Sequence, residues 1–185
     1  MPVIAYHNRR FDPDVRTLHR IIQSGILGHI VKVSIHLHDF VRRKDWQTIR
    51  SLGRGALCSW GTHLIDCCFY LFGRNLSLEW ARLLHVMNPG DAEDGFMICL
   101  SSDKTTIDVE YLNCAARRLP NWQVLGTSGT AVSDKDHFNV KFCEPGRLPR
   151  LPRRLTPPAG VSARLFCTRQ KPACQTLLIS DMVDL

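Results

Sequence analysis

Residues 53–66 read GRGALCSWGTHLID and contain the residue types whose spacing best suits chemistry. A glycine-rich loop leads into a predicted helix over residues 59–72, which carries His63 and, three residues later, Asp66. Side chains at that spacing share one helix face, so an imidazole and a carboxylate can point into the same cleft. The loop permits close backbone approach, and a helix start carries partial positive charge. The pattern suits a site for a hydroxylated or anionic small molecule; a capping or core histidine is the alternative.

Length and composition favour one soluble domain. The 185 residues suffice for a single hydrophobic core, with or without an appendage, and 22% charged residues is ordinary for a globular protein. No apolar run approaches the roughly 20 residues that cross a bilayer. The first residues lack the basic start and long apolar centre of a signal peptide. We therefore expect a cytoplasmic protein with no membrane partner.

The eight cysteines indicate neither a metal site nor a disulfide framework. Most of them stand singly among apolar residues, where a free cysteine behaves as a small hydrophobic residue. No Cys-x-x-Cys pair occurs, and the spacing from Cys167 to Cys174 is too wide for the usual zinc pairing.

The net charge of +7 is uneven along the chain. Residues 1–146 hold 17 basic and 15 acidic residues, whereas residues 147–185 hold 7 basic and 2 acidic residues. Four basic residues of the second part, Arg147, Arg150, Arg153 and Arg154, alternate with proline and leucine and lack interleaved aromatic residues. This pattern is typical of a solvated extended segment, and we expect no nucleic-acid partner.

The order of the predicted elements indicates an α+β fold. Asp12 is predicted to cap a helix that begins at Pro13 and ends at Gly25. Short turns separate the later strands, and short connections make neighbouring strands antiparallel. Strands are expected at residues 3–8, 31–37, 79–87, 95–101, 105–113, 122–133 and 137–144. We therefore predict a largely antiparallel, open-faced sheet with two main helices on one face.

The strand at residues 31–37 has one apolar and one polar face. His36 and His38 lie on the polar face with Lys32 and Ser34, either in a cleft over the sheet or on a solvated surface. The two-residue spacing is compatible with metal ligation, but the sequence offers no third ligand.

Several blocks in order along the chain resemble the C-terminal domain of the glucose–fructose oxidoreductase/inositol dehydrogenase/MocA family. They read NRRFDPD at residues 8–14, IQSGILGHI at 22–30, GAL at 55–57, WGTHLID at 60–66, YLFG at 70–73 and WQVLGTSGT at 122–130. The resemblance covers roughly residues 3–155.

The resemblance implies a domain assignment. Enzymes of this family have an N-terminal domain that holds NAD or NADP and a C-terminal α+β domain that holds the substrate and usually the oligomer interface. Residues 1–158 are assigned to the second domain, and residues 159–185 form an unassigned tail, for which a truncated or frame-altered gene product is one hypothesis. No G-x-G-x-x-G follows a strand. The N-terminal Rossmann domain is therefore expected to be absent, with no cofactor bound by this fragment alone.

The resemblance also implies roles for four residues. His63 corresponds to the family's base, which takes the hydroxyl proton during hydride transfer. The family often has an aspartate four residues before this histidine, and here Ser59 stands there. A serine caps a helix but cannot stabilise an imidazolium by charge. Arg10, Asp66 and Ser59 are candidate substrate-binding residues, with structural roles as the alternative for Arg10 and Asp66.

Two function hypotheses follow. The first is the substrate-binding and oligomerisation domain of a sugar or cyclitol oxidoreductase, which is inactive alone and forms a homo-oligomer through its sheet. A separate Rossmann-domain chain is a further candidate partner. The alternative is a non-catalytic binding or scaffolding protein that keeps the cleft and the sheet interface. The sequence leaves open whether the chain is itself an enzyme, which polyol binds, and whether the parent enzyme uses NAD or NADP.

Overall fold

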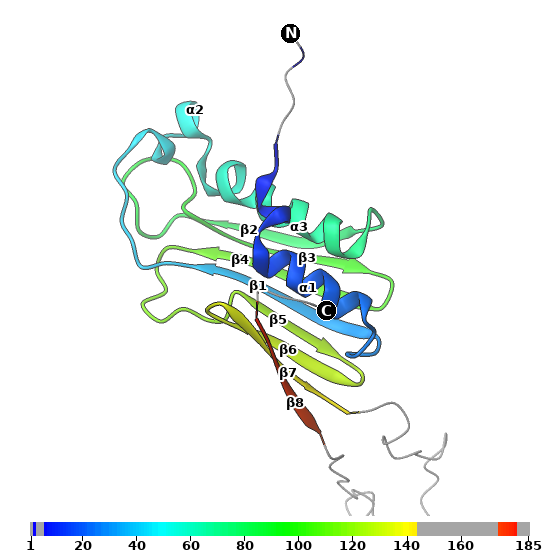
Figure 1. The fold of residues 1–185 in the computed structure, drawn as a ribbon. Helices are drawn as coiled ribbons and strands as arrows, with labels where there is room; N and C mark the ends of the chain where they lie inside the picture. The colour runs from blue at the N-terminus through cyan, green and yellow to red at the C-terminus, as the bar shows by residue number, and fades with distance from the viewer. Residues whose placement is uncertain (1, 3–5, 144–173, 181–185) are drawn as a thin grey trace, which may run out of the picture.

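The computed structural model describes residues 2, 6–143 and 174–180 of the chain. They form one eight-stranded sheet in the order β2-β3-β4-β1-β5-β6-β7-β8, with the main helices α1 and α3 along one face (Figure 1). The helical elements are η1 (Asn8–Phe11), α1 (Pro13–Gln23), η2 (Trp46–Thr48), α2 (Arg50–Gly53), η3 (Leu57–Gly61) and α3 (Thr62–Phe72). The strands are β1 (Ile30–His38), β2 (Ser77–Leu84), β3 (Gly95–Ser102), β4 (Thr105–Leu112), β5 (Trp122–Gly126), β6 (Gly129–Asp134), β7 (His137–Phe142) and β8 (Gln175–Ser180). The predicted α+β class is confirmed.

Strand β1 lies in the middle of the sheet and separates two strands that are consecutive in the sequence. It pairs in parallel with β4 and antiparallel with β5, so Val33 faces both Ile107 and Val124. Every other named pair is antiparallel. The expectation that consecutive strands are neighbours therefore fails at one place, where β1 is inserted between β4 and β5.

The core lies between the sheet and the two helices. The apolar stripe of α1, which includes Val15, Leu18 and Ile21, is buried against the alternating apolar positions of β1, Val33 and Ile35. Helix α3 adds further buried side chains from Leu64, Cys67, Cys68 and Leu71. Burial of each large aliphatic side chain stabilises the fold by about 1.5–3 kcal/mol, so both helices are held firmly on the sheet.

The ends of α1 agree with the sequence except for its cap. The helix begins at Pro13 and ends before Gly25, whose φ of +71° favours glycine. Asp12, however, makes no capping hydrogen bond, because its carboxylate lies 3.3 Å from Arg9 instead. Asp14 ties the helix to the sheet by accepting a 2.8 Å hydrogen bond from Trp122 Nε1.

Two predicted strands require correction, and one unassigned segment contains a strand. Residues 3–5 of the first lie outside the described residues, while Tyr6 and His7 are irregular and Asn8 begins η1. The single strand expected at residues 122–133 is two strands, because the chain reverses at residues 127–128 and β5 pairs with β6. Residues 175–180, which lie in the segment left unassigned, form β8 along β7.

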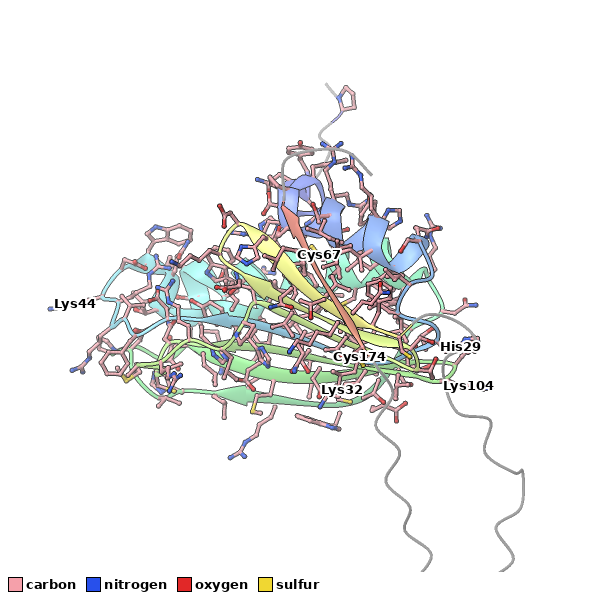
Figure 2. The ribbon with its side chains drawn as sticks, turned by 60° about the horizontal axis from the view of Figure 1, so that its bottom comes forward. His29, Lys32, Lys44, Cys67, Lys104 and Cys174 are labelled. Carbon is pink, nitrogen blue, oxygen red and sulfur yellow. The ribbon has the colours of Figure 1, made fainter. Side chains whose placement is uncertain are left out.

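The face of the sheet opposite the helices is open. Lys32 lies on this face and pairs with Asp108 at 2.7 Å, and Figure 2 shows it on the side of the sheet away from α1. The edge strand β2 is exposed along most of its length, including Trp80. None of the helices in the described residues is long and apolar enough to cross a membrane.

Candidate functional site

The helix that carries His63 begins earlier than predicted and is wound unevenly. A π-helical stretch, Leu57–Gly61, leads directly into α3. Gly55 adopts φ +84°, and a Cβ there would lie 2.3 Å from the Glu93 carboxyl carbon. The space beside this loop glycine is therefore filled by the Glu93 side chain of the chain itself and not left open for a ligand.

Arg10 and Asp66 form a two-pronged ion pair across 56 residues of sequence. Arg10 Nε donates to Asp66 Oδ2 at 2.8 Å, and a second guanidinium nitrogen donates to Oδ1. The guanidinium also lies 5.7 Å from the Tyr70 ring centroid. Hydrogen bonding from Arg10 lowers the pKa of Asp66, so its carboxylate is ionised at neutral pH.

His63 lies near this pair, on α3. Burial lowers its pKa below the usual value, and the neighbouring Arg9 and His7 side chains lower it further. Burial is the main cause; His63 does not lie at a free helix N-terminus, because helical turns continue on both sides of it. The ring is therefore neutral at pH 7.

Two imidazoles meet at this point. The His7 and His63 rings are 5.6 Å apart between centroids and cross at 81°. The Nδ1 atom of each ring is buried without a hydrogen-bond partner among the described residues, whereas neither Nε2 atom is so enclosed. His7 was not among the predicted site residues, although it directly precedes the NRRFDPD block.

A stack of flat groups forms one wall beside His63. The Arg9 guanidinium carbon lies 4.5 Å from the Trp60 ring centroid, and Trp60 stacks on Tyr111 at 6.0 Å. Tyr111 in turn stacks on the buried Phe96. Cation–π attraction and stacking therefore fix Arg9 and Trp60 from the core outward.

Ser59 takes no part in this cluster. Its hydroxyl donates to the carbonyl oxygens of Gly55 at 3.1 Å and Ala56 at 3.2 Å, within its own helical turns. The hydroxyl lines a different cavity, beside Glu93 and Asp94. Of the four predicted site residues, the structure thus brings together His63, Asp66 and Arg10 and leaves Ser59 apart.

The comparison with protein families identifies the fold and its relatives. Residues 15–132 match the GFO/IDH/MocA C-terminal domain, which is more than half of the 185 residues. The chain belongs to this family. The resemblance seen in the sequence is therefore confirmed, and the GFO/IDH/MocA fold accounts for the single open-faced sheet.

Curated relatives carry oxidoreductase names. An uncharacterised oxidoreductase of Schizosaccharomyces pombe is 36% identical over 100 residues, covering 52% of this chain and 27% of the relative. The scyllo-inositol 2-dehydrogenase (NADP(+)) of Bacillus subtilis is 25% identical over 130 residues, covering 69% of this chain and 36% of that enzyme. The chain thus spans only 27% to 37% of the length of the curated relatives it matches.

Solved structures show the same fold at low identity. An NAD-binding protein from Listeria innocua superimposes with a TM-score of 0.69 at 22% identity, over 97% of this chain and 48% of that protein. An oxidoreductase from Bacillus subtilis superimposes with a TM-score of 0.67 at 18% identity, over 76% of this chain and 48% of that protein.

The GFO/IDH/MocA family implies a nicotinamide dinucleotide, and the described residues do not fit one. A pyrophosphate binds where a glycine-rich turn opens a helix N-terminus. Here α1 begins between the carboxylates of Asp12 and Asp14, which would repel it, and the first turn of α3 continues an existing helix.

The other histidines flagged in the sequence belong to the opposite face of the sheet. His38 Nε2 lies 2.6 Å from Glu110 Oε1, and His36 Nδ1 lies 2.8 Å from the Pro120 carbonyl oxygen. Across the described residues no three His, Cys, Asp or Glu side chains gather closely enough to hold a metal ion.

Proposed function

We propose that this chain is the substrate-binding and oligomerisation domain of a GFO/IDH/MocA oxidoreductase acting on a sugar, cyclitol or related polyol. The observation that carries the proposal is the cluster on α3: a neutral His63 with an unenclosed Nε2, beside the Arg10–Asp66 pair. His63 occupies the position of the family's base. The name of one relative, a scyllo-inositol 2-dehydrogenase, supports a polyol as the ligand class.

The polyol is expected to lie in the open part of the cleft. The cavity beside Arg9, Leu64 and Cys67 measures only about 40 Å³, enough for a water molecule but not for a sugar. The ligand therefore rests against the exposed rims of His63, Arg9 and Trp60. On this proposal the nicotinamide is held by a nucleotide-binding domain outside these 185 residues, and the 185 residues alone do not turn over NAD or NADP.

Calorimetric titration of the full chain with myo-inositol and glucitol tests this function. We expect saturable binding that falls at least about tenfold in His63→Ala, because a substrate-facing polar contact is lost. His29→Ala is the control. His29 is exposed and lies just before β1, at one end of the sheet (Figure 2), and it is not one of the residues grouped around His63. Absence of binding by the wild-type chain, or equal loss in the control, would contradict the proposal.

We also propose that the open face of the sheet joins two copies of this chain. Trp80 is 48% exposed, and its partner across the strands is Cys99, which lies on the face without helices. Large exposed aromatic residues at such positions are typical of interfaces. Trp80→Asp should convert an oligomer to a monomer in light scattering, while Phe11→Asp, an exposed residue at η1, should not.

One observation favours the alternative, a non-catalytic binding protein. Ser59 offers no carboxylate to His63, and its hydroxyl is turned toward its own helix. An imidazole base works best when another group holds its second nitrogen. The test is to assay Ser59→Asp together with a nucleotide-binding domain. If the turnover does not rise above that of the wild-type chain, the binding role is favoured.

A further inference from the structure

The two buried Nδ1 atoms in the cleft restrict where the imidazole protons lie. A neutral imidazole has one N–H donor and one lone-pair acceptor. The Nδ1 atoms of His7 and His63 have no hydrogen-bond partner among the described residues. A buried N–H without a partner is rarer and costlier than a buried acceptor without one. Both rings therefore place their proton on Nε2, the atom that is not enclosed.

Arg9 adds further donors to the same cleft. One N–H of its guanidinium donates to the Asp12 carboxylate at 3.3 Å, and the guanidinium lies over the Trp60 ring. A guanidinium has five N–H groups. The Arg9 side chain makes no other hydrogen bond among the described residues, so most of its N–H groups are free.

The acidic groups nearby do not cancel this donor surface. The Asp66 carboxylate is held by both prongs of Arg10, and Asp12 lies against Arg9. A third carboxylate, that of Asp14, accepts hydrogen bonds from Val15 N and Trp122 Nε1, each at 2.8 Å. All three carboxylates are thus already paired with donors of this chain. What this group of residues presents outward is N–H from His7, His63 and Arg9.

We propose that His7 is a ligand-binding residue and that the cleft takes a carboxylate-bearing polyol, a sugar acid. Its carboxylate oxygens accept hydrogen bonds from the Nε2–H groups of His7 and His63, assisted by Arg9. A carboxylate is an acceptor only, and charge-assisted hydrogen bonds are about twice as strong as neutral ones. This inference rests on the proposed function and narrows its polyol to an acid.

The tautomer has a consequence for His63. With the proton on Nε2, the ring donates to a ligand oxygen and does not accept a hydroxyl proton. The resting cleft of this chain is therefore built to bind an oxygen-rich anion. A carboxylate at position 59 would be needed to draw the proton to Nδ1 and leave the Nε2 lone pair free.

Nitrogen-15 NMR of the imidazoles tests the tautomer without any ligand. At pH 8 we expect His7 and His63 to show Nε2–H and unprotonated Nδ1, assigned by loss of each signal in His7→Phe and His63→Phe. His36 is the internal control, because its Nδ1 lies 2.8 Å from the Pro120 carbonyl oxygen and must carry the proton there. An Nδ1–H signal for His7 or His63 would overturn the inference.

Calorimetry with gluconate and glucitol tests the ligand class, because the two share a carbon skeleton and differ by the carboxylate. We expect gluconate to bind at least about tenfold tighter, and His7→Phe, which keeps the ring shape, to lose that advantage. His29→Phe is the matched control. Glucitol binding as tightly as gluconate overturns this inference and leaves the proposed function standing; binding of neither ligand overturns both.

Discussion

Removing Arg10 should destabilise the domain by leaving the Asp66 carboxylate without its partner. The Arg10 side chain is 36% exposed and that of Asp66 is 13% exposed, so the pair is neither a surface pair nor a fully buried one. Loss of one partner costs about 0–1 kcal/mol at the surface and about 3–5 kcal/mol in the interior. We expect Arg10→Met to lower the free energy of unfolding by about 2 kcal/mol, or the melting temperature by about 4–8 °C.

Urea unfolding followed by circular dichroism measures this change. Arg118→Met is the matched control, because Arg118 pairs with Asp39 at side-chain exposures of 66% and 49% and should cost less than about 0.5 kcal/mol. A loss at Arg10→Met below about 0.5 kcal/mol would refute the assignment of the Arg10–Asp66 pair as a stabilising link between η1 and α3.

The pH dependence of the same variant is a second check. Arg10 lowers the pKa of Asp66 in the folded state. Its contribution is therefore fully present above the unfolded pKa of about 3.9 and is lost as the pH falls through the folded value. The stability gap between wild type and Arg10→Met should persist at pH 6 and close in stronger acid. A gap that closes near pH 6 would mean that another group is responsible.

Three further outcomes are expected. Ser59→Asp should raise the pKa of His63, seen in an NMR titration, because a carboxylate one turn away favours the charged imidazole; an unchanged or lower pKa would argue against their sharing a helix face. Gly126→Ala should lower stability in urea by at least about 2 kcal/mol, since a Cβ there would lie 2.1 Å from the Leu27 carbonyl oxygen, and a neutral effect would contradict this close approach. Cys67 should resist thiol reagents at pH 8 in the folded chain, because burial raises its pKa to about 12; rapid labelling under native conditions would contradict that burial.

Local patterns predicted much of the fold. Helix α1 lies between Pro13 and Gly25. Within a helix, proline fits only the first turn, and glycine readily adopts the left-handed conformation that ends a helix. Alternation of apolar and polar residues predicted β1. The single-strand prediction over residues 122–133 failed because it ran through the Gly-Thr-Ser-Gly stretch at residues 126–129, where the chain reverses between β5 and β6.

The candidate site could be predicted only in part. His63 and Asp66 share a helix face, and the resemblance to the family pointed to both. His7 was missed because a lone histidine before η1 carries no periodic signal, and only folding sets its ring 5.6 Å from that of His63. Ser59 was included on sequence position, yet its hydroxyl serves its own helix.

The sequence by itself determined the family, the helix that carries His63 and the α+β class, because these depend on short-range spacing and on ordered blocks. Only the tertiary structure decided that β1 lies between β4 and β5. It alone paired Arg10 with Asp66 and left the two Nδ1 atoms without partners. These features depend on contacts between residues far apart in the chain, and no local preference specifies which distant groups will meet.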